Sequence, residues 1–290
     1  MHLHFFSADR LNTYLPDSPD DVVNMNFYLP VPTGKILSYT VFILLIFLFF
    51  SCRTYLFPRA DLTTISTSRV ADPGLSHEEY VLRLLADGWP VDSLNTAASA
   101  DYLDDDEKSI ILAHNLVRSN PRKYARLYVA EYITYFQGKE FHYPGLPTIM
   151  LTREGAAPAE ELFRDLMRSR PLNLLYPSRG LSKAAKSHVQ YLCDLGIRGH
   201  GGQGGLRARI ERHGEWDVRI AENIAYGNFS PHDAVLYLLI DDQVFDRSHR
   251  KILLNPGFQY VGVAKDRHPA YPTGYTYVMN YACFFRESTE

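Results

Sequence analysis

Four short segments in the C-terminal half of the chain carry side chains that could do chemistry. His200 stands in a glycine-rich run, and Glu222 stands in the sequence Ala-Glu-Asn. Two adjacent acids, Asp241 and Asp242, follow, and His249 lies in the sequence Asp-Arg-Ser-His-Arg-Lys. Imidazoles and carboxylates are groups that proteins use for proton transfer and for binding divalent cations. These five residues are therefore the first candidates for a functional site.

The rest of the sequence argues against several classes of function. The chain has no Gly-x-Ser-x-Gly nucleophile elbow, no His-Glu-x-x-His zinc-protease motif and no Rossmann glycine fingerprint. The glycines after His200 do not form a phosphate loop, because no Lys-Ser or Lys-Thr follows them. With a net charge of -3 and no run of Lys and Arg, the chain is not expected to bind nucleic acid.

The N-terminal part of the chain predicts export. Residues 36–51 form an apolar run without a charged side chain. The run is slightly shorter than the roughly 20 residues of a spanning helix, and its length better fits the core of a signal peptide. We take residues 1–35 as an N-terminal segment whose true start lies near Met25. This start is preferred because residues 1–24 contain acidic side chains and residues 25–35 contain none.

Two kinds of membrane anchor fit the signal or anchor segment, residues 36–52. The apolar run is either an uncleaved single-pass helix or the signal of a bacterial lipoprotein. In the second case, the sequence Leu-Phe-Phe-Ser-Cys is a relaxed lipobox, and Cys52 would carry the lipid after cleavage. The flanking charges do not decide the orientation. Lys35 precedes the run, whereas Arg53 and Arg59 follow it and would by themselves favour a cytoplasmic C-terminal part.

The other two cysteines, Cys193 and Cys283, form no Cys-x-x-Cys motif. They could pair in an oxidising compartment, or both could remain buried free thiols. The sequence leaves these two alternatives open.

After the anchor, residues 53–103 read as a tether with one short helix, which begins after a capping box at Ser76. A globular domain is expected over residues 104–286, and the hydrophobic content of 46% supports a packed core. His114 and His188 lie on apolar faces of expected helices, so we assign both to this core.

The domain shows strong helix signals first and strand signals late. Acidic residues 104–107 begin one helix, Ser182 is expected to cap a second that ends at Gly196, and Ser230 caps a third. Alternating apolar residues predict strands at Tyr260–Lys265 and Tyr275–Phe284. This order predicts an α/β fold, a three-layer α-β-α sandwich.

The order of these segments resembles the CAP superfamily, which contains cysteine-rich secretory proteins, antigen 5 and plant pathogenesis-related proteins. The similarity is greatest to its microbial SCP-like extracellular domains, and it covers about residues 104–285. The supporting motifs are Ala113-His114-Asn115, Asn120–Ala125, Thr152–Gly155, Gly180-Leu181-Ser182, Arg209-Ile210, His213–Trp216 and Phe258–Val263, together with the four segments above.

The resemblance implies a cleft in which two histidines and two acids meet. By motif, His200 and His249 are the histidines, and Glu222 is the first acid. The second acid falls at Asp241 or Asp242, where many relatives have Glu. Some family members bind zinc or another divalent cation between the histidines, so the resemblance implies His200 and His249 as metal ligands.

Two hypotheses of different class follow from the resemblance. The preferred one is an extracytoplasmic binding module for a small lipid, a sterol or a protein partner. It would be anchored in the membrane as a lipoprotein or single-pass protein, or be secreted after cleavage. The alternative is a zinc-dependent, protease-like hydrolase in which Glu222 is the general base. Binding is preferred because the sequence offers no recognisable nucleophile.

Overall fold

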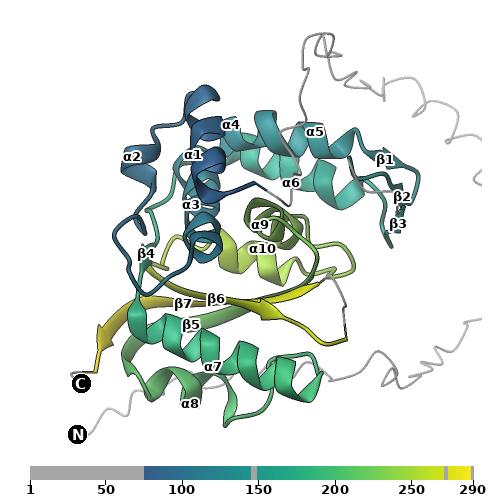
Figure 1. Cartoon of the computed structure of the whole chain (residues 1–290). Coiled ribbons are helices and arrows are strands. Elements are labelled where there is room, and N and C mark those ends of the chain that lie inside the picture. The colour runs from purple at the N-terminus through teal and green to yellow at the C-terminus, as the bar shows by residue number, and fades with distance from the viewer. Residues whose placement is uncertain (1–74, 145–148, 271–273, 289–290) are drawn as a thin grey trace, which may run out of the picture. The chain divides into compact units, whose positions relative to one another are not determined.

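The structure is a computed structural model that describes residues 75–144, 149–270 and 274–288 (Figure 1). The predicted N-terminal segment, the signal or anchor segment and Cys52 lie outside the described residues. None of the helices in the described ranges is both long enough and apolar enough to cross a membrane.

A four-stranded sheet forms the centre of the domain, in the order β4-β6-β7-β5. Its strands are β4 (Tyr176–Pro177), β5 (Gly214–Gly227), β6 (Tyr260–Arg267) and β7 (Tyr275–Glu287). β7 runs antiparallel to both β5 and β6, whereas β4 is parallel to β6. Seven successive residues of β7, from Thr276 to Ala282, are buried. Because side chains alternate between the faces of a strand, both faces of the sheet must be covered there.

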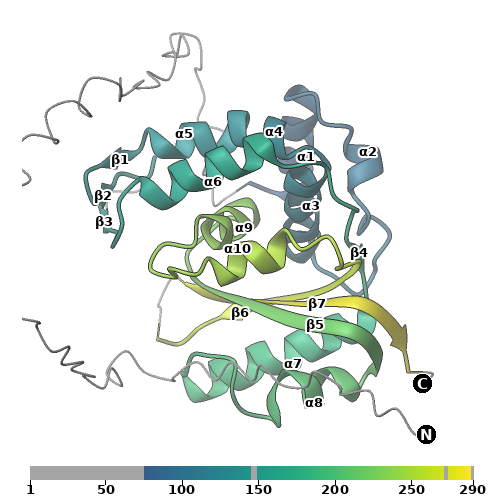
Figure 2. The ribbon, with the colours of Figure 1, turned by 180° about the vertical axis from the view of Figure 1, so that it is seen from behind.

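Helices cover these two faces (Figures 1 and 2). α7 (Arg179–Leu195) and α8 (Gly205–Glu211) lie on one face, and α3 (Asp105–Ser119), α9 (Pro231–Ile240) and α10 (Ser248–Leu253) lie on the other. Eight of the ten residues of α9 are buried, as expected for a helix enclosed by β5, α3, α6 and α10. The mixed α/β class is confirmed, with the helices and the sheet in three layers.

The remaining elements extend the layer that contains α3. They are α1 (His77–Ala86), α2 (Val91–Leu94), α4 (Pro121–Tyr124), the π-helix η2 (Ala125–Val129), α5 (Ala130–Ile133), α6 (Ala157–Arg168) and the small sheet of β1 (Phe136–Gln137), β2 (Glu140–Phe141) and β3 (Met150–Leu151).

The segment before residue 104 is more ordered than the tether we expected. α1 begins at the predicted capping box of Ser76, but α2 was not predicted. Trp89, Val91 and Leu94 belong to the main hydrophobic core, and the Trp89 indole donates to Tyr128 at 2.9 Å. These side chains are buried by residues distant in the sequence, which local periodicity does not reveal. The packed domain therefore begins before residue 104.

Helix α7 also begins earlier than predicted. Ser178, not Ser182, is the N-cap, and its hydroxyl accepts from the backbone N–H of Leu181 at 3.2 Å. Ser182 instead donates to the carbonyl oxygen of Ser178 at 2.9 Å. The helix ends at Gly196 as predicted, with a left-handed φ of 64°.

We expect Gly262→Ala to destabilise the domain, because a Cβ at Gly262 in β6 would overlap the backbone of Leu181 and Ser182 in α7. Overpacking of this kind costs roughly 1–3 kcal/mol in the free energy of unfolding. The matched control is Gly201→Ala, where the added Cβ meets no atom within 4 Å. Urea unfolding followed by circular dichroism measures both variants, and equal midpoints would contradict close packing of α7 on β6.

Candidate functional site

His200 and His249 line one cavity of about 360 Å³, together with Asp241 and Asp242. His200 lies in the loop between α7 and α8, Asp241 ends α9, and His249 lies in α10. Glu222, in β5, does not line the cavity but hydrogen-bonds to His200. The other lining residues are Arg198, Gly199, Ile224, Tyr226, Tyr237, Leu238 and Val244. The structure therefore brings together the candidates that the sequence places far apart.

Glu222 orients His200 and is itself neutralised by Arg209. Its Oε1 lies 2.9 Å from Nδ1 of His200, and Nη2 of Arg209 donates to Oε1 and Oε2 at 2.8 and 2.7 Å. The side-chain amide of Asn280, in the orientation that satisfies both of its ends, donates to Oε2 at 3.0 Å. Burial opposes ionisation of Glu222, but the hydrogen bond from His200 and the charge of Arg209 together hold its pKa below the usual value.

Asp241 orients His249 in a similar way. Its Oδ1 lies 2.6 Å from Nδ1 of His249, and its Oδ2 accepts from the backbone N–H groups of His249 and Arg250 at 2.9 and 3.3 Å. The left-handed φ of 62° at Asp241 ends α9 and turns this residue toward the start of α10. The short Asp side chain thereby reaches His249.

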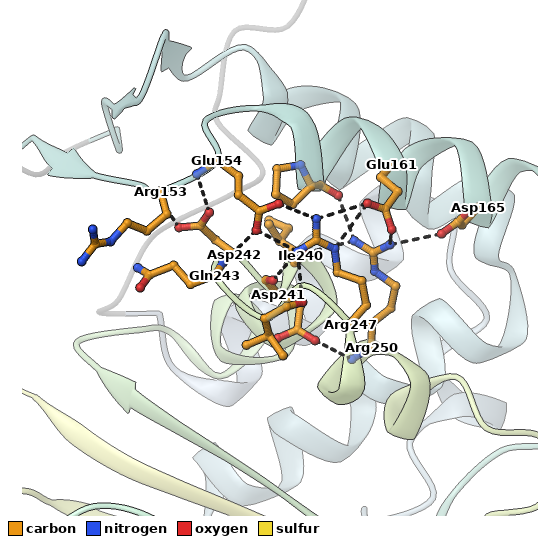
Figure 3. Close-up of polar contacts among 12 residues, drawn as sticks. Arg153, Glu154, Glu161, Asp165, Ile240, Asp241, Asp242, Gln243, Arg247 and Arg250 are labelled. Carbon is orange, nitrogen blue, oxygen red and sulfur yellow. Dashed lines mark hydrogen bonds and ion pairs between the residues drawn. The ribbon is translucent and has the colours of Figure 1, made fainter. Parts of the chain in front are cut away.

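Asp242, the other candidate for the second acid, makes different contacts. Its carboxylate oxygens accept from the backbone N–H groups of Arg153 and Glu154 at 3.0 and 2.9 Å (Figure 3). Asp242 contributes to the wall of the cavity, but Asp241 is the acid that binds the histidine.

The two imidazoles could supply some, but not all, of the ligands that a divalent cation needs. Each Nδ1 lies against a buried carboxylate, and such pairing is typical of metal-binding histidines because it fixes the ring and its tautomer. Neither Nε2 atom makes a hydrogen bond to another described residue, and both rings line the cavity. Within the described ranges, no group of three His, Cys, Asp or Glu side chains could hold a metal ion. At this cavity the described residues thus offer two ring nitrogens to a cation.

The two histidines that we assigned to the core are both buried. His114 hydrogen-bonds to the carbonyl of Ile110 and the hydroxyl of Tyr281, both at 2.7 Å, and burial lowers its pKa to about 4. His188 lies closer to the site, since its Nε2 is 3.0 Å from the carbonyl oxygen of Gly199 and 3.9 Å from Oε1 of Glu222. His188 therefore supports the cleft from within the core.

Cys193 and Cys283 are both free thiols, so they do not pair in this structure. Cys193 contacts the hydroxyl of Thr276, and neither cysteine lines the cavity.

Sequence reasoning assigned no role to two residues that hold the His200 loop. Arg209 belongs to one of the family motifs, and its Nη1 donates to the carbonyl oxygens of His200 and Gly202 at 3.2 and 3.3 Å. The hydroxyl of Tyr226 accepts from the backbone N–H of Gly199 at 2.9 Å. An arginine in a seven-residue helix suggests a solvent contact, and only its pairing with Glu222 in the strand that follows reveals its role.

Residues 113–281 match the model of the CAP, or cysteine-rich secretory protein, family. This chain belongs to the CAP family. A search of curated proteins found no match to the chain.

Three solved structures are similar to this CAP protein. An outer surface protein from Borrelia burgdorferi is 19% identical, with 40% of this chain and 80% of that chain covered and a TM-score of 0.34. An extracellular protein containing an SCP domain from Bacillus anthracis is 26% identical, with coverages of 42% and 38% and a TM-score of 0.30. Venom allergen-like protein 4 from Schistosoma mansoni is 13% identical, with coverages of 64% and 92% and a TM-score of 0.36.

We expect Arg209→Met to lower the free energy of unfolding by about 3–5 kcal/mol, because Glu222 would be left as a buried charge without its cation. The matched control is Arg207→Met in the same helix, which breaks an exposed ion pair with Glu211 and should change stability by no more than about 1 kcal/mol. Urea unfolding at pH 7 compares the two variants.

Adding Glu222→Gln to Arg209→Met should restore part of the lost stability, since the buried charge is then gone. If Arg209→Met were no more destabilising than Arg207→Met, Arg209 would not be neutralising Glu222.

Proposed function

We propose that this CAP domain is an extracytoplasmic binding module whose cleft takes up a ligand through His200, His249 and the surrounding apolar wall. One observation carries the proposal. Both acids of the site, Glu222 and Asp241, are buried and already engaged in orienting the imidazoles. Of these four side chains, the two imidazoles keep a ring nitrogen that can meet a ligand, and neither of the two carboxylates is free to activate a water molecule.

The environment of Glu222 disfavours the alternative, a zinc-dependent hydrolase in which this residue is the general base. A general base must reach the proton that it removes and needs a pKa near the working pH. Glu222 is only 6% exposed, its pKa is lowered, and its oxygens accept from Arg209 and His200. Taking a proton at Glu222 would require these bonds to break.

A divalent cation, zinc or another, is the first ligand that we propose for His200 and His249. When bound, the cation would supply a Lewis acid that attracts an oxygen atom of an incoming molecule. Glu222 and Asp241 would keep the two rings in position and raise their basicity. With two protein ligands, the affinity should be lower than that of a structural zinc site, which has four.

The apolar part of the cavity supports a lipid, a sterol or an apolar segment of a protein as the larger ligand. Ile224, Leu238 and Val244 line it beside Tyr237, which is 39% exposed. Phe245 follows Val244 directly and is 83% exposed. An exposed aromatic side chain next to a ligand-sized cavity is a common feature of binding surfaces.

The proposed location combines the apolar run of residues 36–52 with the descriptions of similar proteins. One similar structure is described as an outer surface protein and another as an extracellular protein. We infer that the domain lies outside the cytoplasm and is anchored through a lipid on Cys52 or a single-pass helix, unless cleavage releases it. Mass spectrometry decides between them: a chain that begins at a lipid-modified Cys52 would identify the lipid anchor, and an uncleaved apolar run would identify the helix.

Native mass spectrometry of the full chain with added zinc tests the cation site. We expect one bound zinc ion in the wild type and none in His200→Ala or His249→Ala, because each variant removes half of the protein ligands. The control variant is His142→Ala, which changes a partly exposed histidine and should still bind zinc.

A lipid or sterol mass that co-purifies with the full chain would identify the larger ligand. Wild-type protein that binds no zinc, lipid, sterol or apolar peptide would overturn the proposal. Substrate turnover abolished by Glu222→Gln would establish the hydrolase instead.

A further inference from the structure

The loop between α9 and α10, residues 241–247, has an unusual backbone conformation. Three of its residues have positive φ angles although none is glycine: Asp241 at 62°, Gln243 at 71° and Arg247 at 53°. Residues with a side chain rarely adopt this conformation, and it persists only where the surroundings hold it in place. The neighbours of the loop must therefore provide strong contacts.

Reciprocal hydrogen bonds tie this loop to the segment that precedes α6. The carboxylate of Asp242 accepts from the backbone of Arg153 and Glu154, as described above. In return, Oε1 of Glu154 accepts from the backbone N–H of Gln243 at 2.9 Å. Figure 3 shows Asp242 and Glu154 side by side between the two segments. Each segment thus satisfies backbone groups of the other.

Arg247 and Glu154 form the centre of this contact. Nη1 of Arg247 donates to Oε1 of Glu154 at 2.8 Å, and Nη2 donates to Oε2 at 2.7 Å. The side chains are only 11% and 18% exposed. A bidentate arginine–carboxylate pair shielded from water fixes both the distance and the plane of the partners.

The same guanidinium also reaches the residue that orients His249. Nη1 of Arg247 donates to the carbonyl oxygens of Asp241 and Val244 at 3.0 and 3.1 Å. Asp241 is held through its main chain by Arg247 while its carboxylate holds His249. A continuous set of bonds therefore runs from Glu154 to the site (Figure 3).

We propose that Glu154, acting through Arg247, is a positioning residue that fixes the 241–247 loop and thereby the orientation of His249. The inference rests on the proposed function in one respect, since the value of an oriented His249 lies in binding a ligand. Glu154 is not one of the two histidines and two acids of the site. It does not line the cavity and makes no contact with the imidazole of His249.

Asp165 in α6 provides a matched control, whereas Glu161 does not, because Glu161 also accepts from Arg247 at 3.2 Å. Arg250 in α10 donates to Glu161 and Asp165 of α6 at 2.7 and 3.1 Å. Within the described ranges, Asp165 thus contacts the helix that carries His249 but makes no side-chain hydrogen bond to the 241–247 loop. Asp165→Asn weakens the attachment of α10 to α6, whereas Glu154→Gln weakens the loop.

Amide hydrogen exchange in the cation-free full chain tests the proposal, because the backbone N–H groups of His249 and Arg250 both donate to Asp241. We expect Glu154→Gln to raise exchange at these two amides by roughly tenfold. Arg247→Lys should do the same, since lysine keeps the charge but cannot form the bidentate pair. Asp165→Asn should leave the two amides at the wild-type rate.

The amide of Gly199, which lines the cavity and donates to Tyr226, serves as the internal reference. Unchanged exchange at His249 and Arg250 in Glu154→Gln would overturn the proposal. An equal rise at Gly199 would overturn it too, because Glu154 would then support only the general stability of the domain.

The zinc measurement separates this inference from the proposed function. If the wild type binds zinc, Glu154→Gln should weaken the affinity by about tenfold. If the wild type binds no cation but the exchange pattern is as expected, cation binding fails while the positioning role of Glu154 stands.

Discussion

The cleft depends first on the neutralisation of the Glu222 carboxylate. A charge removed from water in this way is tolerated only beside a cation and hydrogen-bond donors. Arg209 supplies the cation from α8, and its second Nη atom holds the carbonyl oxygens of the loop that carries His200. A single buried guanidinium therefore joins β5, α8 and the loop into one unit, and His200 takes its position from that unit.

In the other half of the cleft, no arginine side chain among the described residues hydrogen-bonds to the carboxylate of the acid. The Asp241 carboxylate is compensated by the His249 ring and by two backbone N–H groups at the start of α10. That arrangement requires a left-handed turn at the end of α9, and the strain is balanced by contacts with the segment before α6. The carboxylates that orient the two histidines come from different elements, Glu222 from β5 and Asp241 from the end of α9.

The sequence predicted those features that depend on local signals. The predicted strands at β6 and β7 are present, although four successive residues of β6 and seven of β7 are buried, so their burial does not alternate. Glycine marked the end of α7 at Gly196. Strand β5 was missed, since its first half is mostly exposed and a bulge between Asp217 and Ile220 breaks the alternation. The start of α7 was misplaced because two serines, four residues apart, both carry a capping side chain.

The functional residues were found by motif, but their partners were not. Asp241 and Asp242 are chemically identical neighbours, and only the backbone φ of Asp241 decides which one meets His249. Arg209 and Glu154 act on residues from other elements, so no spacing within the chain marks them. Long-range pairs of charges become visible only when the fold has brought the segments together.

Adjacent residues of β5 serve the two halves of the cleft. Glu222 pairs in register with Asn280 and binds His200, whereas the side-chain amide of Asn223 donates to the carbonyl oxygen of His249 at 3.2 Å. Neighbouring side chains of a strand point to opposite faces. The reversed dipeptide, Asn-Glu, would have the same composition and charge but would put the acid against α10 and leave Arg209 facing an amide. The site therefore depends on the order of Glu222 and Asn223 in β5, and not only on the presence of both residues.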